Sequence, residues 1–167
     1  MGKRLGIVGA VIAVVALVVA AVSPALGSSG STASGHADRQ QTLRVLAVFT
    51  EFDPNIDLGA AGFSLGDEVV FSGNLLRNGQ QVGRVGVVCS FVSVANAARV
   101  EAQCPTTSIL PGGQITTQGT IVNRSLNFTL PVTGGSGQFQ GAGGQVVSRD
   151  ISTPTQPQVE LTFHLKF

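Results

Sequence analysis

Residues 130–144 read LPVTGGSGQFQGAGG and contain six glycines in a stretch that otherwise alternates apolar and polar side chains. Glycine adopts positive φ angles and permits close backbone approach, which in a β context marks tight turns, bulges and barrel corners. Clustered glycines can also cradle phosphate, but that use requires a following helix, and no helical pattern follows here. The stretch therefore predicts a β domain with a sharp corner in this part of the chain.

Apolar residues after residue 40 alternate in short runs and do not repeat at helical spacing over more than two turns. The last run shows this most clearly, because Leu161, Phe163 and Leu165 alternate with polar residues. Glycine, proline and asparagine separate the runs and supply turns. The pattern predicts eight strands: 42–51, 67–76, 81–93, 98–110, 114–122, 125–132, 144–152 and 158–167.

Eight short antiparallel strands joined by hairpins must pack as two sheets or close into a barrel. Closure removes exposed edges, and an eight-stranded barrel encloses an interior that side chains fill or that holds one small ligand. We therefore predict an all-β fold, an eight-stranded antiparallel β-barrel over residues 41–167. The irregular segment 53–64 is expected to form a lid over one mouth. Asp67, at a strand start, is expected to accept backbone N–H bonds in a turn.

Residues 1–27 are organised like an export signal. Two basic residues precede an apolar run over 5–22, and small residues then suit cleavage after Gly27. Residues 28–40 are polar and rich in serine and glycine, as flexible linkers are. We therefore expect a secreted protein. The length of the apolar run leaves a second interpretation open, in which the segment is not cleaved, contacts the membrane and anchors the protein there.

The charge balance excludes binding of nucleic acid through electrostatic attraction to its phosphates. Ten basic and nine acidic residues give a formal net charge of +1 without a basic stripe. The chain has no Trp and no Tyr, so its aromatic side chains are nine Phe. Its two histidines, His36 and His164, fall in the linker and on the polar side of the last strand. We expect no nucleic-acid partner, no metal and no cofactor.

The two cysteines, Cys89 and Cys104, fall in consecutive predicted strands. A hairpin that turns about Asn96 and Ala97 places them directly opposite each other, where Cα atoms lie roughly 4.5–5.5 Å apart and a disulfide can form. An exported protein also reaches an oxidising compartment. We therefore predict a structural disulfide. The alternative is a pair of buried thiols, with Cys89 lining a pocket.

Two stretches of the sequence resemble a known family. Residues 63–91, FSLGDEVVFSGNLLRNGQQVGRVGVVCSF, are similar to the allene oxide cyclase pattern of S-L-G-D, F-S, a hairpin turn and a glycine-containing strand ending in cysteine. Residues 134–141, GGSGQFQG, with the later G-Q-V and the terminal L-T-F-H-L, resemble that family's glycine motif and last strand. The same glycines resemble the G-G-T-G signature of dirigent proteins. The two families share an eight-stranded barrel, so the resemblance implies this fold for nearly the whole domain.

The resemblance also implies a function. Plant allene oxide cyclases convert an unstable fatty-acid epoxide into a chiral cyclopentenone, in a greasy barrel that folds the substrate and shields a reactive cation from water. A carboxylate assists epoxide opening, and an ordered water anchors the epoxide oxygen. The expected partner is thus a small hydrophobic ligand, the expected activity that of an isomerase of cyclase type, and the expected assembly a homo-oligomer, a trimer or a dimer.

Site residues follow from the resemblance position by position. It implies Glu51 as the catalytic carboxylate, with Thr50 an equal candidate for the same position. The alternative for Glu51 is a solvated residue at a strand end. Gly73 occupies the place of an asparagine in the family, and Asn74 follows it. The implied ligand-binding residues are Phe71, Asn74 and Cys89.

Three functions remain open. The first is a cyclase or stereo-guiding barrel that binds and folds a small hydrophobic molecule, and this is the one we expect. The second is a non-catalytic carrier of an apolar ligand. The third is a structural or interaction barrel with a packed interior. Small inward residues with one or two polar groups favour the first, a roomy apolar interior the second, and large interdigitated side chains the third.

Overall fold

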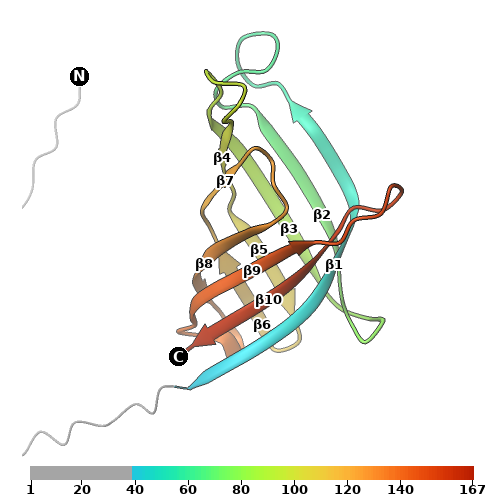
Figure 1. Ribbon diagram of the computed structural model, residues 1–167. Helices are drawn as coiled ribbons and strands as arrows, with labels where there is room; N and C mark the ends of the chain where they lie inside the picture. Colours follow the sequence, from blue (N-terminus) through green and yellow to red (C-terminus); the bar gives the residue numbers. More distant parts are fainter. Residues whose placement is uncertain (1–38) are drawn as a thin grey trace, which may run out of the picture. The chain divides into compact units, whose positions relative to one another are not determined.

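The computed structural model describes residues 39–167 (Figure 1), so the predicted signal segment 1–27 and residues 28–38 of the linker lie outside the described residues. Among residues 39–167, no helix is long and apolar enough to cross a membrane. The elements are β1 (Gln40–Ile56), β2 (Glu68–Arg77), β3 (Gln80–Ser93), β4 (Glu101–Gln103), β5 (Thr106–Leu110), β6 (Gly113–Thr117), β7 (Thr120–Val122), β8 (Phe128–Gly135), the 3₁₀ helix η1 (Gly137–Phe139), β9 (Gly143–Asp150) and β10 (Gln158–Lys166).

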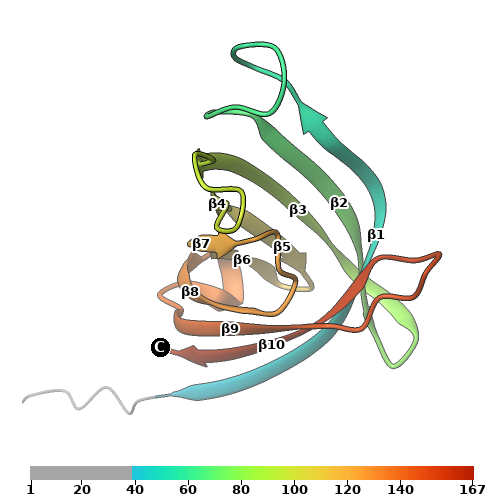
Figure 2. The same ribbon diagram turned by 45° about the horizontal axis from the view of Figure 1, so that its top comes forward.

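Eight strands of the described chain close into an antiparallel ring. Neighbours around the ring are β1, β2, β3, β5, β6, β8, β9 and β10, and β10 pairs again with β1. Each strand thus pairs with the next ring strand along the chain, which makes an up-and-down barrel. The predicted eight-stranded fold is confirmed. Strands β4 and β7 extend the wall from β3 at the end that also carries the β1–β2 loop (Figures 1 and 2).

Two predicted strands are each divided in the structure. The predicted strand 98–110 comprises β4 and β5, with a break at Cys104 and Pro105. Proline has no N–H to donate to a sheet, so pairing is interrupted there. The predicted strand 114–122 comprises β6 and β7, and the two breaks lie side by side, because the Cys104 N–H donates to the Gly119 carbonyl at 2.9 Å. As a result, β5 and β6 complete the ring while β4 and β7 form its extension.

The glycine-rich stretch forms the predicted corner. β8 ends at Gly135, η1 follows, and β9 begins at Gly143. Gly137 has a φ of +60° and lies so close to the Gly112 carbonyl that a Cβ there would collide with it. The Gln138 N–H donates to the same carbonyl at 2.8 Å. Glycine is therefore required where this corner packs against the β5–β6 turn.

The hydrophobic core lies inside the ring, as the alternation of the last strand predicts. Leu161, Phe163 and Leu165 of β10 are buried, whereas His164 and Lys166 are exposed on the outside. Because successive side chains point to opposite faces of a sheet, each ring strand contributes one such inward row.

Candidate functional site: an apolar cavity in the barrel

A cavity of about 230 Å³ lies at the end of the barrel that β4 and β7 extend. Three phenylalanine rings, both cysteines and several aliphatic side chains form most of its wall. The lining residues are Phe49, Phe52, Val69, Phe71, Cys89, Ala102, Cys104, Ile121, Arg124, Ser125, Leu126 and Pro157. We call this space the mouth cavity.

A second cavity, of about 40 Å³, lies deeper in the barrel and is called the inner cavity here. Four residues line both cavities: Phe49, Phe71, Ile121 and Leu126. The inner cavity is otherwise lined by Val85, Val87, Thr106, Ser108, Thr117, Phe128, Val146, Val159, Leu161 and Phe163. Because four side chains line both spaces, the two cavities adjoin each other.

A β-bulge in β1 determines which of its side chains reach the mouth cavity. Phe49 and Glu51 pair with adjacent residues of β2, so Thr50 is an extra residue in the strand. The extra residue reverses the inward and outward alternation beyond it. Phe52 therefore lines the cavity together with Phe49, and Glu51 does not.

The three rings form one aromatic wall. Phe71 of β2 meets Phe49 edge to face, with ring centroids 4.9 Å apart and an interplanar angle of 89°. The Phe52 ring lies 6.0 Å from the Phe71 ring and is 61% exposed, which places it at the outer rim. Edge-to-face rings offer an apolar ligand both ring faces and ring edges.

Glu51 and Asn74, two of the predicted site residues, lie away from the cavities. The Glu51 side chain is 72% exposed, accepts a hydrogen bond from the Ser72 hydroxyl, and lies 3.6 Å from the Arg84 guanidinium. Asn74 falls on the same side of β2 as Ser72, opposite to Phe71, and lines neither cavity. Phe71 and Cys89 are thus the predicted site residues that the structure brings to the cavity.

The two cysteines form a disulfide across β3 and the end of β4, with Cα atoms 4.2 Å apart. Ser90 pairs with Gln103, so the neighbouring positions 89 and 104 are directly opposed. The pairing predicted from the hairpin register is confirmed, and the alternative of two buried thiols is wrong. Both cysteines also line the mouth cavity, so the disulfide is part of its wall.

Charged groups are scarce around both cavities. Arg124 is the one charged side chain among the described residues that line them. The other polar contributions are hydroxyls, from Ser125 at the mouth and from Thr106, Ser108 and Thr117 in the inner cavity. Over residues 39–167, no group of three His, Cys, Asp or Glu side chains is placed to hold a metal ion.

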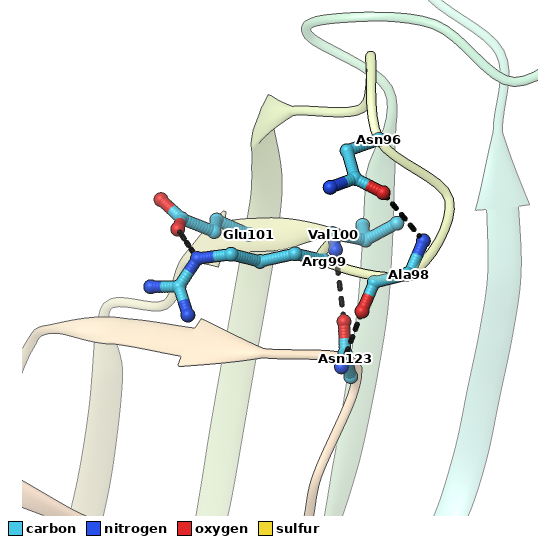
Figure 3. Close-up of polar contacts among 6 residues, drawn as sticks. All are labelled: Asn96, Ala98, Arg99, Val100, Glu101 and Asn123. Atoms are coloured by element: carbon cyan, nitrogen blue, oxygen red, sulfur yellow. Dashed lines mark hydrogen bonds and ion pairs between the residues drawn. The ribbon is translucent and has the colours of Figure 1, made fainter.

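Arg124 follows β7 in a segment with an uncommon backbone conformation. Both Asn123 and Arg124 have a φ of +54°, which asparagine tolerates and which costs roughly 1–3 kcal/mol for other side chains. The side-chain amide of Asn123 offsets the cost of this backbone conformation with two hydrogen bonds. It accepts from the Val100 N–H at 2.8 Å and donates to the Ala98 carbonyl at 3.1 Å (Figure 3). The β3–β4 turn therefore holds this segment in place.

Arg124 and an aromatic pair connect the β1–β2 loop to the mouth. Phe63 of the loop meets Phe91 of β3 edge to face at 4.7 Å. The Arg124 guanidinium lies 5.2 Å from the Phe63 ring centroid and 5.0 Å from that of Phe91, within cation–π range. These contacts fasten the loop beside the mouth cavity.

Asp67 fixes the base of the same loop. Its fully buried carboxylate accepts hydrogen bonds from the Ser64 N–H at 2.7 Å, the Leu58 N–H at 3.1 Å and the Ser64 hydroxyl at 3.2 Å. The Ser64 N–H is the main cause that holds the pKa of Asp67 below its ordinary value, because it stabilises the carboxylate form. The predicted turn role of Asp67 is confirmed.

The structure revises the predicted lid. Residues 53–56 belong to β1, and none of residues 57–64 lines either cavity. The loop borders the mouth and does not cover it. Phe49, Ile121 and Leu126 line both cavities but were not among the residues predicted from the sequence. Alternation along the strand could have identified Phe49, since it continues the inward row of Val45 and Ala47.

The protein is thus an up-and-down antiparallel β-barrel with an apolar cavity at one end. Residues 49–163 match the allene oxide cyclase barrel like domain, and the chain belongs to that family. Among solved structures, it is similar to pyocyanin demethylase, with 28% identity over 72% of this chain and 98% of that chain and a TM-score of 0.61.

Two further structures share the fold at lower identity. A pterocarpan synthase dirigent protein is 12% identical over 84% of this chain and 95% of that chain, with a TM-score of 0.62. An exo-specific intermolecular Diels–Alderase is 17% identical over 77% of this chain and 99% of that chain, with a TM-score of 0.58. The barrel is thus shared by proteins whose names describe different reactions on small molecules.

Proposed function

We propose that the protein binds a small, mostly apolar molecule in its barrel and guides the cyclisation of that molecule through shape. The observation that carries the proposal is the lining of the two cavities. Phe49, Phe52 and Phe71 form an aromatic wall, and no carboxylate or imidazole is among the described residues that line the space. A site of this kind lacks a side chain for general acid–base catalysis, so its contribution is to hold the reactant in one folded conformation away from water.

Phenylalanine rings suit such a reaction. A ring face attracts positive charge, so a cationic centre that develops during ring closure would be stabilised next to Phe49 or Phe71. The named activities of the similar structures, a dirigent pterocarpan synthase and a Diels–Alderase, support a reaction in which geometry decides the product. The enzymatic activity that we propose is therefore that of an isomerase of cyclase type.

The test combines retention of a ligand with analysis of its stereochemistry. The purified protein is incubated with a lipid extract, washed and examined by native mass spectrometry. Because cyclisation leaves mass unchanged, the released ligand is also compared with untreated extract on a chiral column. A retained ligand with an altered stereoisomer ratio supports the proposal, and a barrel that stays empty across varied extracts contradicts it.

A carrier of an apolar ligand is the second candidate. The same lack of an acid or base in the cavity lining favours it, because a carrier needs only a complementary apolar space. The two functions differ in one result of the experiment above. A ligand that is retained and released with its stereoisomer ratio unchanged supports the carrier and contradicts the cyclase.

We also propose that the chain is exported and cleaved after Gly27. The Cys89–Cys104 disulfide supports this, since such bonds form and persist in oxidising compartments. Intact mass and N-terminal sequencing of the protein from its natural host test the proposal. A chain that begins at Ser28 is the expected result, and an intact N-terminus in the membrane fraction would favour the anchored alternative.

A homo-oligomer, a trimer or a dimer, completes the proposal. Val88 of β3 and Ile109 of β5 are 37% and 50% exposed on the outer face of adjoining strands, and we assign this face to the contact between copies. Native mass spectrometry reports the number of chains directly. A monomer at micromolar concentration would contradict this part of the proposal.

A further inference from the structure

Three side-chain hydroxyls gather on one wall of the inner cavity. Thr106 of β5 lies directly opposite Thr117 of β6, and Ser108 is the next inward-facing residue of β5. All three line the inner cavity, and every other side chain that lines it is Phe, Val, Leu or Ile. We call these three residues the hydroxyl cluster.

Ser108 and Thr117 are buried, Thr106 is half-buried, and the three hydroxyls have no protein partners among residues 39–167. Ser108 is 2% exposed and Thr117 is 5% exposed. Within the described part of the chain, none of the three hydroxyls forms a hydrogen bond with another protein group. By contrast Ser148, which is 4% exposed, donates from its hydroxyl to the Leu126 carbonyl at 2.8 Å.

The unpaired oxygens face free space. Every fully inaccessible side-chain nitrogen or oxygen of the described residues has a hydrogen-bond partner. The oxygens of Ser108 and Thr117 lack such a partner and must therefore be accessible, and the accessible space next to them is the inner cavity that they line. Their hydrogen-bonding capacity is directed at whatever occupies that cavity.

Packing does not account for the cluster. A buried hydroxyl without a partner destabilises a fold relative to alanine or valine of similar shape, because it loses its hydrogen bonds to water. The neighbouring strand supplies Val85 opposite Ser108 and Val87 opposite Thr106, so apolar residues already suit this wall. The inner cavity is large enough for the oxygen of a water molecule or of a ligand to reach these hydroxyls.

We propose that the hydroxyl cluster anchors a neutral, oxygen-bearing end of an otherwise apolar ligand, such as a ketone, an ether or an alcohol. A hydroxyl both donates and accepts, so the cluster matches any of these groups. An ionised group is excluded, because no opposite charge is among the described residues that line the inner cavity. The ligand then enters oxygen first, with its apolar body against Phe49 and Phe71.

This inference rests on the proposed function and adds the ligand class and the direction of binding. Its test uses two probes of nearly identical shape, acetophenone and α-methylstyrene, which differ in a carbonyl oxygen against a CH₂ group. Their dissociation constants are measured by NMR titration for the wild-type protein and for the double variant Ser108→Ala/Thr117→Val. Thr107→Val is the matched control, since Thr107 lies on the outer side of β5.

We expect the double variant to bind acetophenone about tenfold more weakly, the loss of roughly one hydrogen bond, and α-methylstyrene at least as tightly as wild type. It should melt at the same or a higher temperature, and Thr107→Val should bind both probes like wild type. Equal acetophenone affinity in wild type and double variant would overturn the anchor alone. If neither probe binds the wild-type protein, the result contradicts both the proposed function and the anchoring role of the hydroxyl cluster. If the double variant does not fold, Ser108→Ala and Thr117→Val are measured singly under the same criteria.

Discussion

At the scale of single residues, one extra amino acid in β1 decides which side chains meet a ligand. Thr50 is the bulged position, and it turns Glu51 outward and Phe52 inward. The family resemblance implied Glu51 as the catalytic carboxylate, and regular alternation would have placed it on the same side as Phe49, but the bulge turns it outward. A bulge of this kind leaves no clear mark in the sequence, because it needs only one extra residue in one strand and no fixed residue type. The assignment of Phe71 and Cys89 did not depend on this position.

The contrast between Phe71 and Glu51 gives a direct prediction. Phe71→Ala removes a ring shared by both cavities and should reduce ligand retention strongly, at a stability cost of up to about 3 kcal/mol for a half-buried phenylalanine. Glu51→Gln should retain ligand like wild type, because that side chain lies outside the barrel. Native mass spectrometry of both variants measures retention. A larger loss in Glu51→Gln than in Phe71→Ala would restore Glu51 as a site residue.

The disulfide predicts a loss of stability on its removal. Cys89 and Cys104 are 15 residues apart, and closing a loop of about that length stabilises a fold by about 3 kcal/mol in the chain-entropy model. The variant Cys89→Ser/Cys104→Ser should therefore melt on the order of 10 °C below the oxidised wild type. Thermal unfolding followed by circular dichroism measures the difference. An unchanged melting temperature, or two thiols that alkylate without reductant, would speak against the bond.

At the scale of elements, the sequence predicted the ring strands well, and the exceptions have physical causes. Alternation and turn residues were sufficient for strands such as β3 and β10, where the pattern is regular. The breaks at Pro105 and Gly119 were not foreseen, because the predicted strands were continued through a single proline and a single glycine in segments rich in threonine, a residue that favours strands. The extent of β1 was also missed, since Pro54 ordinarily marks the end of a strand. Boundaries set by hydrogen bonding between distant segments cannot be read from local pattern alone.

The β1–β2 loop should respond to acid. The pKa of Asp67 is lowered by the Ser64 N–H, so its carboxylate stabilises the fold above the unfolded pKa of about 3.9. That contribution is lost as pH falls through the lower pKa of the folded state. Hydrogen exchange at Leu58 and Ser64 should therefore accelerate relative to the barrel strands below about pH 4. Protection that is unchanged down to pH 2, or equal in Asp67→Ala and wild type at pH 7, would contradict this role.

At the scale of the whole molecule, the closed barrel was predictable and its open interior was not. Eight strands favour closure because closure pairs the exposed strand edges, and the glycine corner and the family motifs are consistent with a closed barrel. Whether Phe49, Phe71 and their neighbours fill the interior depends on register, on the bulge and on the extension made by β4 and β7. The sequence shows none of these directly. The hydroxyl cluster likewise becomes visible only when Thr106 and Thr117 are placed opposite each other.

The mouth cavity is the proposed site for a small, mostly apolar molecule. The most direct test is ligand occupancy by native mass spectrometry in a blocked barrel. Leu126 lines both cavities, so Leu126→Trp should fill the shared space, whereas Val92→Trp alters a half-exposed residue that lines neither. We predict that Leu126→Trp retains no ligand from an extract while wild type and Val92→Trp retain it equally. Equal retention by all three proteins would place the ligand elsewhere and contradict binding in the mouth cavity.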